Sequence, residues 1–152
     1  MAELKTELLF DLELKVEPVL SIGATPRGNR GIGPITGGAF KGPKLNGEVL
    51  PGGGDWLMGR SDGAFDLDVR TTLRTDDGAL IYMPYPGIVA GAPDVLQRLF
   101  SGDDVDPSEY YLRITPTFET SAEKYEWLNR VVAVGTGALA GDTVHYSIHR
   151  VL

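Results

Sequence analysis

The sequence predicts an all-β protein, folded as a closed or nearly closed antiparallel β-barrel with one short helix. Apolar residues follow a period of two in about eight or nine short segments, which is typical of strands that bury one face. No internal repeat occurs, and the segments do not alternate with helices as in a parallel α/β fold. Several segments carry polar residues on both faces, which a barrel explains if one face meets solvent and the other lines a lumen.

The strands are expected at residues 8–16, 19–24, 65–73, 79–85, 110–114, 117–120, 125–134 and 143–152. Residues 65–73 alternate most regularly, and an Asp-Asp-Gly turn at residues 76–78 follows them. Turns of this kind join antiparallel strands, so a hairpin is predicted here. Pro84 and Pro86 are expected to end its second strand, because proline cannot donate to a sheet.

Residues 94–100 form the one predicted helix. Pro93 suits its first turn, Val95 and Leu99 lie on an apolar stripe, and Gly102 is placed to end it. Because the helix is short, we expect it to act as a lid or plug of the barrel.

Length and charge limit the function. The 152 residues fit one β-barrel domain, residues 1–152, and the net charge is −7 with no cluster of lysine and arginine. Nucleic acid and anionic membranes are therefore not expected partners. There is no cysteine, which excludes disulfides, thiol nucleophiles and cysteine-bound zinc. The N-terminus lacks the apolar core of a signal peptide, and no stretch has the ~18 apolar residues of a spanning helix. We predict a soluble cytoplasmic protein.

The stretch 36–56 concentrates backbone-special residues, since seven of the 20 glycines lie in it. Glycine is favoured where the backbone needs a positive φ or a close approach. One interpretation is a pair of turns that join strands. The other is a hinge that holds Asp55 and Trp56 at the mouth of a pocket.

The same stretch carries a family pattern. Residues 37–43 read Gly-Gly-Ala-Phe-Lys-Gly-Pro, and residues 47–56 read Gly-Glu-Val-Leu-Pro-Gly-Gly-Gly-Asp-Trp. With Arg70, the Asp-Asp-Gly turn and Trp-Leu-Asn at residues 127–129, the chain resembles the small bacterial proteins of domain of unknown function 3237. That resemblance covers most of the chain and implies a compact β-barrel of the lipocalin or allene-oxide-cyclase type.

Two of the candidates for a site in the lumen are charged. Asp55 is the acid/base candidate: burial beside Trp56 would raise its pKa, and a nearby Arg70 would lower it. Alternatively, Asp55 bonds its own turn. Arg70 is suited to a substrate carboxylate or a developing enolate if it faces inward. The alternative is that it pairs with Asp66 or Asp68 on the outer wall.

The other candidates are aromatic or amide side chains expected to bind a ligand: Trp56, Tyr82, Tyr125, Trp127 and Asn129. The last three share one face of the strand expected at 125–134, where they would form an aromatic wall with an amide that orients the ligand. The alternative for Trp127 is a place in an aromatic core.

Metal and cofactor sites are not expected. His145 and His149 lie four apart on an expected strand, where that spacing is about 13 Å and too long for one metal. The loop 25–33 has arginines among glycines but matches neither the dinucleotide nor the Walker spacing. No nucleophile motif occurs either.

By elimination, proton transfer by Asp55 and charge stabilisation by Arg70 are the chemistry that remains. The sequence therefore favours a cofactor-independent lyase, isomerase or cyclase that acts on a small, largely apolar organic molecule. The alternatives are a ligand-binding or carrier barrel without catalysis, and an interaction module with a filled interior. A homodimer is possible, because edge strands need cover.

Overall fold

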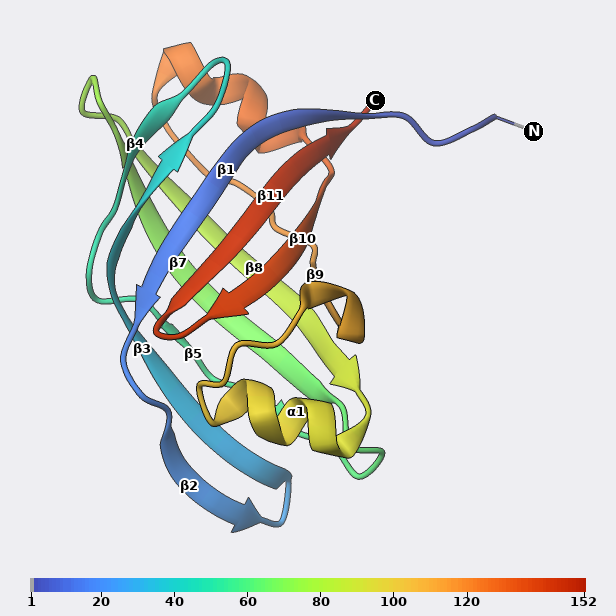
Figure 1. The fold of residues 1–152 in the computed structure, drawn as a ribbon. Coiled ribbons are helices and arrows are strands. Elements are labelled where there is room, and N and C mark those ends of the chain that lie inside the picture. Colours follow the sequence, from blue (N-terminus) through green and yellow to red (C-terminus); the bar gives the residue numbers. More distant parts are fainter. Residues whose placement is uncertain (1) are drawn as a thin grey trace.

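The computed structural model describes residues 2–152, which form a ring of hydrogen-bonded antiparallel strands (Figure 1). Around the ring come β1 (Thr6–Val16), β11 (Thr143–Val151), β10 (Ala133–Ala140), β9 (Tyr110–Ile114), β8 (Leu80–Gly91) and β7 (Phe65–Thr75). β3 (Gly28–Lys41) closes the ring, because it pairs with β1 on one side and joins β7 through short strands on the other. The predicted antiparallel β-barrel is confirmed.

The position between β3 and β7 is filled by one broken strand. It consists of β4 (Asn46–Val49), β5 (Gly54–Asp55) and β6 (Met58–Gly59), each of which pairs with both neighbours. The break is a bulge at residues 50–53, where Gly52 has a φ of 104°. A Cβ on Gly53 would lie 2.3 Å from the Arg70 carbonyl oxygen, so only glycine fits there. The glycine run is thus a bulge that returns the chain to the sheet at Asp55.

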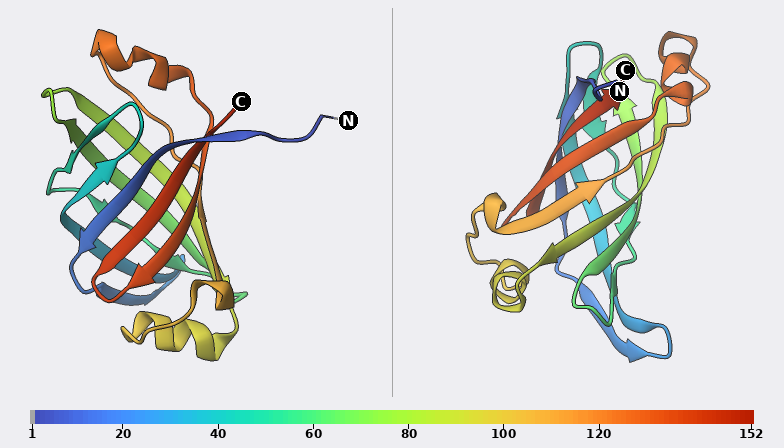
Figure 2. Two further views of the ribbon diagram at one scale, coloured as in Figure 1. Left: turned by 45° about the horizontal axis from the view of Figure 1, so that its top comes forward. Right: turned by 90° about the vertical axis from the view of Figure 1, so that its right-hand side faces the viewer.

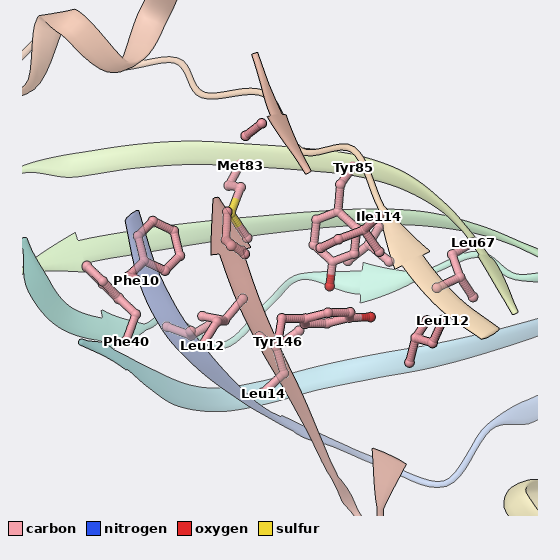
Figure 3. Close-up of a cluster of buried hydrophobic side chains, with 14 of the residues drawn as sticks. Phe10, Leu12, Leu14, Phe40, Leu67, Met83, Tyr85, Leu112, Ile114 and Tyr146 are labelled. Atoms are coloured by element: carbon pink, nitrogen blue, oxygen red, sulfur yellow. The ribbon is translucent and has the colours of Figure 1, made fainter. Parts of the chain in front are cut away.

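Alternation places the core inside the ring. On β7, Leu67, Val69 and Leu73 are buried, whereas most of the side chains between them face solvent. The same period operates on the facing strands, so apolar side chains from all sides meet in the interior (Figure 3). The fully buried large side chains include Phe10, Leu12, Leu14, Leu73, Ile81, Met83, Ile114 and Ile148.

Each end of the barrel is covered by a short helix. Helix α1 (Pro93–Phe100) lies at one end, and the 3-10 helix η2 (Glu123–Arg130) lies at the opposite end, near the two termini (Figures 1 and 2). α1 begins with proline and buries Val95, Leu96 and Leu99, as its stripe predicted. β2 (Leu20–Thr25) extends β3 beyond the ring, and η1 (Pro107–Glu109) precedes β9. None of the helices within residues 2–152 combines the length and the apolar character that crossing a bilayer requires.

The strand predicted at residues 125–134 is wrong in its first half, which is the helix η2. Apolar residues recur every third position there, at Ala122, Tyr125, Leu128 and Val131, and these side chains are buried or partly buried. A period of three is that of a 3-10 helix, which aligns residues i and i+3 on one face. The alternation of Tyr125, Trp127 and Asn129 therefore does not reflect a strand.

Other boundaries differ as well. Pro84 and Pro86 do not end β8, because their carbonyls accept hydrogen bonds from Thr117 and Thr115 on the side away from β7. The N–H and C=O of a strand residue point the same way, so the pairing with β7 does not need the proline nitrogens. The strand expected at 117–120 is reduced to one bridge, Tyr82 to Glu119. The expected loop 25–33 is mostly the β2–β3 hairpin.

Candidate functional site

A cavity of about 370 Å³ lies at the end of the barrel that α1 covers. Its wall is mainly aliphatic and aromatic, with contributions from the barrel strands and from the C-terminal end of α1. The apolar lining includes Val16, Val19, Leu57, Leu67, Val89, Leu99, Phe100, Leu112, Leu139 and Val144. Four lining residues have ionisable side chains: Glu17 and Asp142, which are exposed, and Asp55 and Tyr146, which belong to the barrel strands. A small, mostly apolar pocket with few polar groups is the usual form of a ligand site.

Asp55 is directed inward by its register. It is paired with Val69 on β7, whose side chain is in the core, and paired residues of antiparallel strands project to the same face. The backbone N–H of Asp68 donates to Asp55 Oδ1 over 3.1 Å, which holds the carboxyl group in place.

The cavity raises the pKa of Asp55 to about 6. Loss of solvation is the main cause, the hydrogen bond from Asp68 opposes it, and the nearby Asp68 charge adds to it. Asp55 therefore gains and loses its proton close to neutral pH, which suits a general base or acid.

Two buried tyrosines lie beside this carboxyl group. Tyr85 pairs with Val69, so it stands in the same row across the sheet as Asp55, and its ring meets the ring of Tyr146 from β11. The centroids are 5.6 Å apart, with an edge-to-face angle of 74° (Figure 3). Burial raises the pKa of both phenols, and the negative charge of Asp55 adds to the rise. Both tyrosines thus stay protonated at neutral pH and can donate a hydrogen bond.

Arg70 and Trp56 lie on the outside of the wall, which corrects the expectation that they face the cavity. Arg70 pairs with Gly54, one position out of phase with Asp55, and its guanidinium stacks 5.6 Å from the Trp56 ring centroid. Arg30 Nη1 donates to the Trp56 carbonyl over 2.7 Å on that outer side. The alternation of β7 thus separates Arg70 from Asp55.

Tyr82 is also outside the barrel. It pairs with Thr72 on β7, exchanges two backbone hydrogen bonds with Glu119, and is 37% exposed. It lies on the opposite face of β8 from Met83 and therefore does not reach the interior.

Tyr125, Trp127 and Asn129 lie at the far end of the barrel from Asp55, on η2 (Figure 1). The Asn129 side chain exchanges hydrogen bonds of 2.8 and 2.9 Å with the backbone of Thr120, and the Trp127 ring is contacted by the cations of Lys44 and Arg150. These contacts fasten η2 over the barrel end. The structure does not bring these three residues together with Asp55.

The turn at Asp77 also holds η2. Its carboxylate accepts hydrogen bonds from Lys124 Nζ at 2.8 Å and from the Tyr125 hydroxyl at 2.9 Å, and these bonds, with one from Thr75, lower the pKa of Asp77. A carboxyl group whose pKa is lowered by folding stabilises the fold above its unfolded pKa and loses that contribution as the pH falls through its folded pKa.

We therefore expect Asp77→Asn to destabilise the protein at pH 7 and to lose less stability than the wild type on acidification below pH 4. Urea unfolding at pH 7 and at pH 3 measures both effects. Asp76→Asn, at the neighbouring exposed position of the same turn, is the matched control. A constant difference between Asp77→Asn and wild type at all pH values would contradict the role of this carboxylate.

Sequence reasoning missed Tyr146 and Tyr85, the phenols beside Asp55. The segment 143–151 does carry the signal: His145 and His149 share one face of β11, so Tyr146 must lie on the other. His145 is exposed on the outer wall and His149 is partly buried there, as a strand requires. The residues of this segment do not indicate that the face with Tyr146 is the one inside the barrel.

A wider hollow of about 630 Å³ lies on the outer face of β1, β11 and β10. Its lining includes Asp11, Glu13 and His145, which are exposed to solvent. These side chains face bulk solvent and not an enclosed apolar space. The cavity at Asp55 is the better candidate.

Fold and cavity together define a β-barrel protein with an acidic group set in an apolar chamber at one end. The chain belongs to the family of proteins of unknown function DUF3237, which it matches over residues 4–151. A protein of unknown function from Rhodopseudomonas palustris has a crystal structure that superposes with a TM-score of 0.96, at 36% identity and full coverage of both chains. The crystal structure of a β-barrel-like protein from Acinetobacter baumannii superposes with a TM-score of 0.86 at 41% identity. The match covers 100% of this chain and 98% of the other.

One relative carries a named activity. The chain is 30% identical to the hydroalkoxylation enzyme phnH of Penicillium herquei over 131 residues, which are 86% of this chain and 72% of that protein. The structure of an enzyme from the same fungus superposes with a TM-score of 0.74 at 24% identity, covering 100% of this chain and 97% of the other, and this likeness shows the fold alone.

Proposed function

We propose that this protein is a cofactor-independent enzyme that moves protons on a small, largely apolar organic molecule held in the cavity under α1. The observation that carries the proposal is Asp55: a carboxyl group with a pKa of about 6, directed into an apolar cavity that Tyr146 also lines. A base whose pKa lies near the working pH is largely ionised and still binds a proton strongly enough to remove it from a substrate.

The reaction class that fits best is the addition of a hydroxyl group to a carbon–carbon double bond within one molecule. The substrate O–H bond breaks and its proton goes to Asp55, an O–C bond forms at one alkene carbon, and the protonated Asp55 gives a proton to the other alkene carbon and is thereby ionised again. The product is an isomer of the substrate, so no oxidant, reductant or co-reactant is needed. Tyr146 donates a hydrogen bond to the reacting oxygen and stabilises charge that develops on it.

Two points support this class over other proton transfers. Hydroalkoxylation is such an addition, and the relative phnH is named for it. The apolar wall also offers water few hydrogen-bond partners, which limits the competition of water with the substrate hydroxyl group for the alkene.

The test is a product screen with neutral ortho-alkenyl phenols in D₂O, read by liquid chromatography and mass spectrometry. We expect cyclised isomers that carry one deuterium on carbon. For the best substrate, kcat/KM should rise with pH to a plateau and be half-maximal near pH 6, since the base is active when ionised. The Arg70→Gln variant is the control, and it should retain turnover because Arg70 stands outside the wall.

Binding of these compounds without conversion, at any pH, would contradict catalysis and favour a ligand-binding or carrier barrel. The aliphatic lining is compatible with such a carrier. The two functions therefore differ only in whether Asp55 transfers a proton to or from the ligand. The cytoplasmic location, the homodimer and the independence from metals and cofactors stay predictions.

A further inference from the structure

The charges around the cavity under α1 have one sign. Its lining includes three carboxylates, Glu17, Asp55 and Asp142, and within the described residues 2–152 no lysine, arginine or histidine belongs to that lining. Glu17 and Asp142 are exposed, which places them at the rim, whereas Asp55 lies deeper, beside the core residue Val69.

Nearby cations are turned away from the cavity. Arg70 stacks on the outer face of Trp56, and Arg30 bonds the Trp56 backbone on the same outer side. Arg98, on α1, is directed to Glu109 at 3.4 Å. An anionic ligand would therefore enter an apolar chamber without a counter-ion and next to a carboxylate, which is unfavourable on both counts.

The polar groups of the cavity also complement a particular ligand group. Asp55 Oδ1 is occupied by the Asp68 N–H, so the remaining lone pairs of the carboxylate are available to accept a hydrogen bond from a ligand. Tyr146 remains protonated and can donate one. A neutral hydroxyl group donates to the first and accepts from the second, whereas a carboxylate can only accept.

We propose that the cavity under α1 selects neutral, hydroxyl-bearing apolar molecules and rejects their carboxylate counterparts. This inference uses the site of the proposed function and adds the substrate class: an uncharged phenol, enol or alcohol on a hydrophobic skeleton. It also reverses the expectation that an arginine in the cavity would hold a substrate anion.

The test is isothermal titration calorimetry of the full chain at pH 7.5 with three molecules of similar shape: 2-naphthol, 2-methoxynaphthalene and naphthalene-2-carboxylate. We expect 2-naphthol to bind at least ~10-fold more tightly than the carboxylate, because like charges in an apolar site repel strongly. The methoxy compound should lie between them, since it keeps the acceptor oxygen and loses the donor.

Two variants locate the effect. Asp55→Asn should reduce the difference in affinity between 2-naphthol and the carboxylate, because it removes the buried negative charge that repels the carboxylate. Arg70→Gln should leave all three affinities unchanged. Equal binding of naphthol and carboxylate by the wild type would overturn the inference, and so would failure of all three to bind.

These outcomes are separable from those of the proposed function. If naphthol is preferred as expected but no alkenyl phenol is converted, the selection rule stands and catalysis fails. If alkenyl phenols are converted while the carboxylate binds as well as naphthol, catalysis stands and the selection rule fails.

Discussion

Replacing Asp55 by asparagine is expected to abolish turnover and, at the same time, to make the folded protein more stable at pH 8. Asparagine has the same shape, and its Oδ1 can still accept the hydrogen bond from the Asp68 N–H. It cannot take up a proton, so a reaction that depends on Asp55 as base should slow by about 100-fold or more.

The gain in stability follows from the direction of the pKa shift. Folding raises the pKa of Asp55 from 3.8 to about 6, so the folded state holds this proton more tightly than the unfolded state does. Stability from this group is complete below pH 4 and is lost as the pH rises through 6, which amounts to about 2–3 kcal/mol. The asparagine side chain of the variant has no proton to lose, so the variant keeps the stability that the wild type gives up.

Urea unfolding between pH 4 and pH 8 measures this effect. The free energy of unfolding of Asp55→Asn, relative to wild type, should rise across that interval and level off above pH 6. Asp68→Asn is a useful comparison, because the side chain of residue 68 is exposed on the other face of β7 and affects the pKa of Asp55 only through its charge, which is the smallest of the three causes. A pH-independent difference for Asp55→Asn would show that Asp55 is not ionised in a desolvated site, and undiminished turnover would exclude it as the base.

Replacing Tyr146 by phenylalanine has the second largest expected effect. The change removes one hydroxyl group from the cavity and keeps the ring that packs edge-to-face on Tyr85. If the phenol stabilises charge on the reacting oxygen, kcat should fall by about 100-fold, the usual effect of removing one such donor. KM should rise by a smaller factor than kcat falls, because the apolar wall provides most of the binding.

Steady-state kinetics with the best substrate of the screen separates kcat from KM. Tyr111→Phe is the matched control, since Tyr111 is 51% exposed on the outer wall. A Tyr146→Phe variant with a raised KM and an unchanged kcat would mean that the hydroxyl group binds the substrate without taking part in the reaction.

Much of the fold was predictable because strand alternation is a local property. The pattern of residues 65–73 identified β7, and the Asp-Gly turn after it identified the hairpin with β8. The helix predicted at residues 94–100 differs from α1 by one residue. The strand predicted at 125–134 failed because a period of three and a period of two both fit so short a segment, and only packing against the barrel end distinguishes them.

Of the three residues Asp55, Tyr85 and Tyr146, only Asp55 was predictable from the sequence. Asp55 stood out because a carboxylate follows a run of glycines that only a bulge explains. Tyr85 and Tyr146 are far from it in the chain, and they meet Asp55 only through strand register.

The sequence by itself determined the all-β class, the family, the position of the glycine bulge and the two faces of each regular strand, because these depend on neighbouring residues alone. The tertiary structure decided which face is the inner one. Alternation divides β7 into the set of Val69 and the set of Arg70, and it does not say which set is enclosed. Closure of the ring between β1 and β3 resolved this by burying the apolar set, which turned Arg70 outward and brought Asp55 and Tyr146 to one cavity.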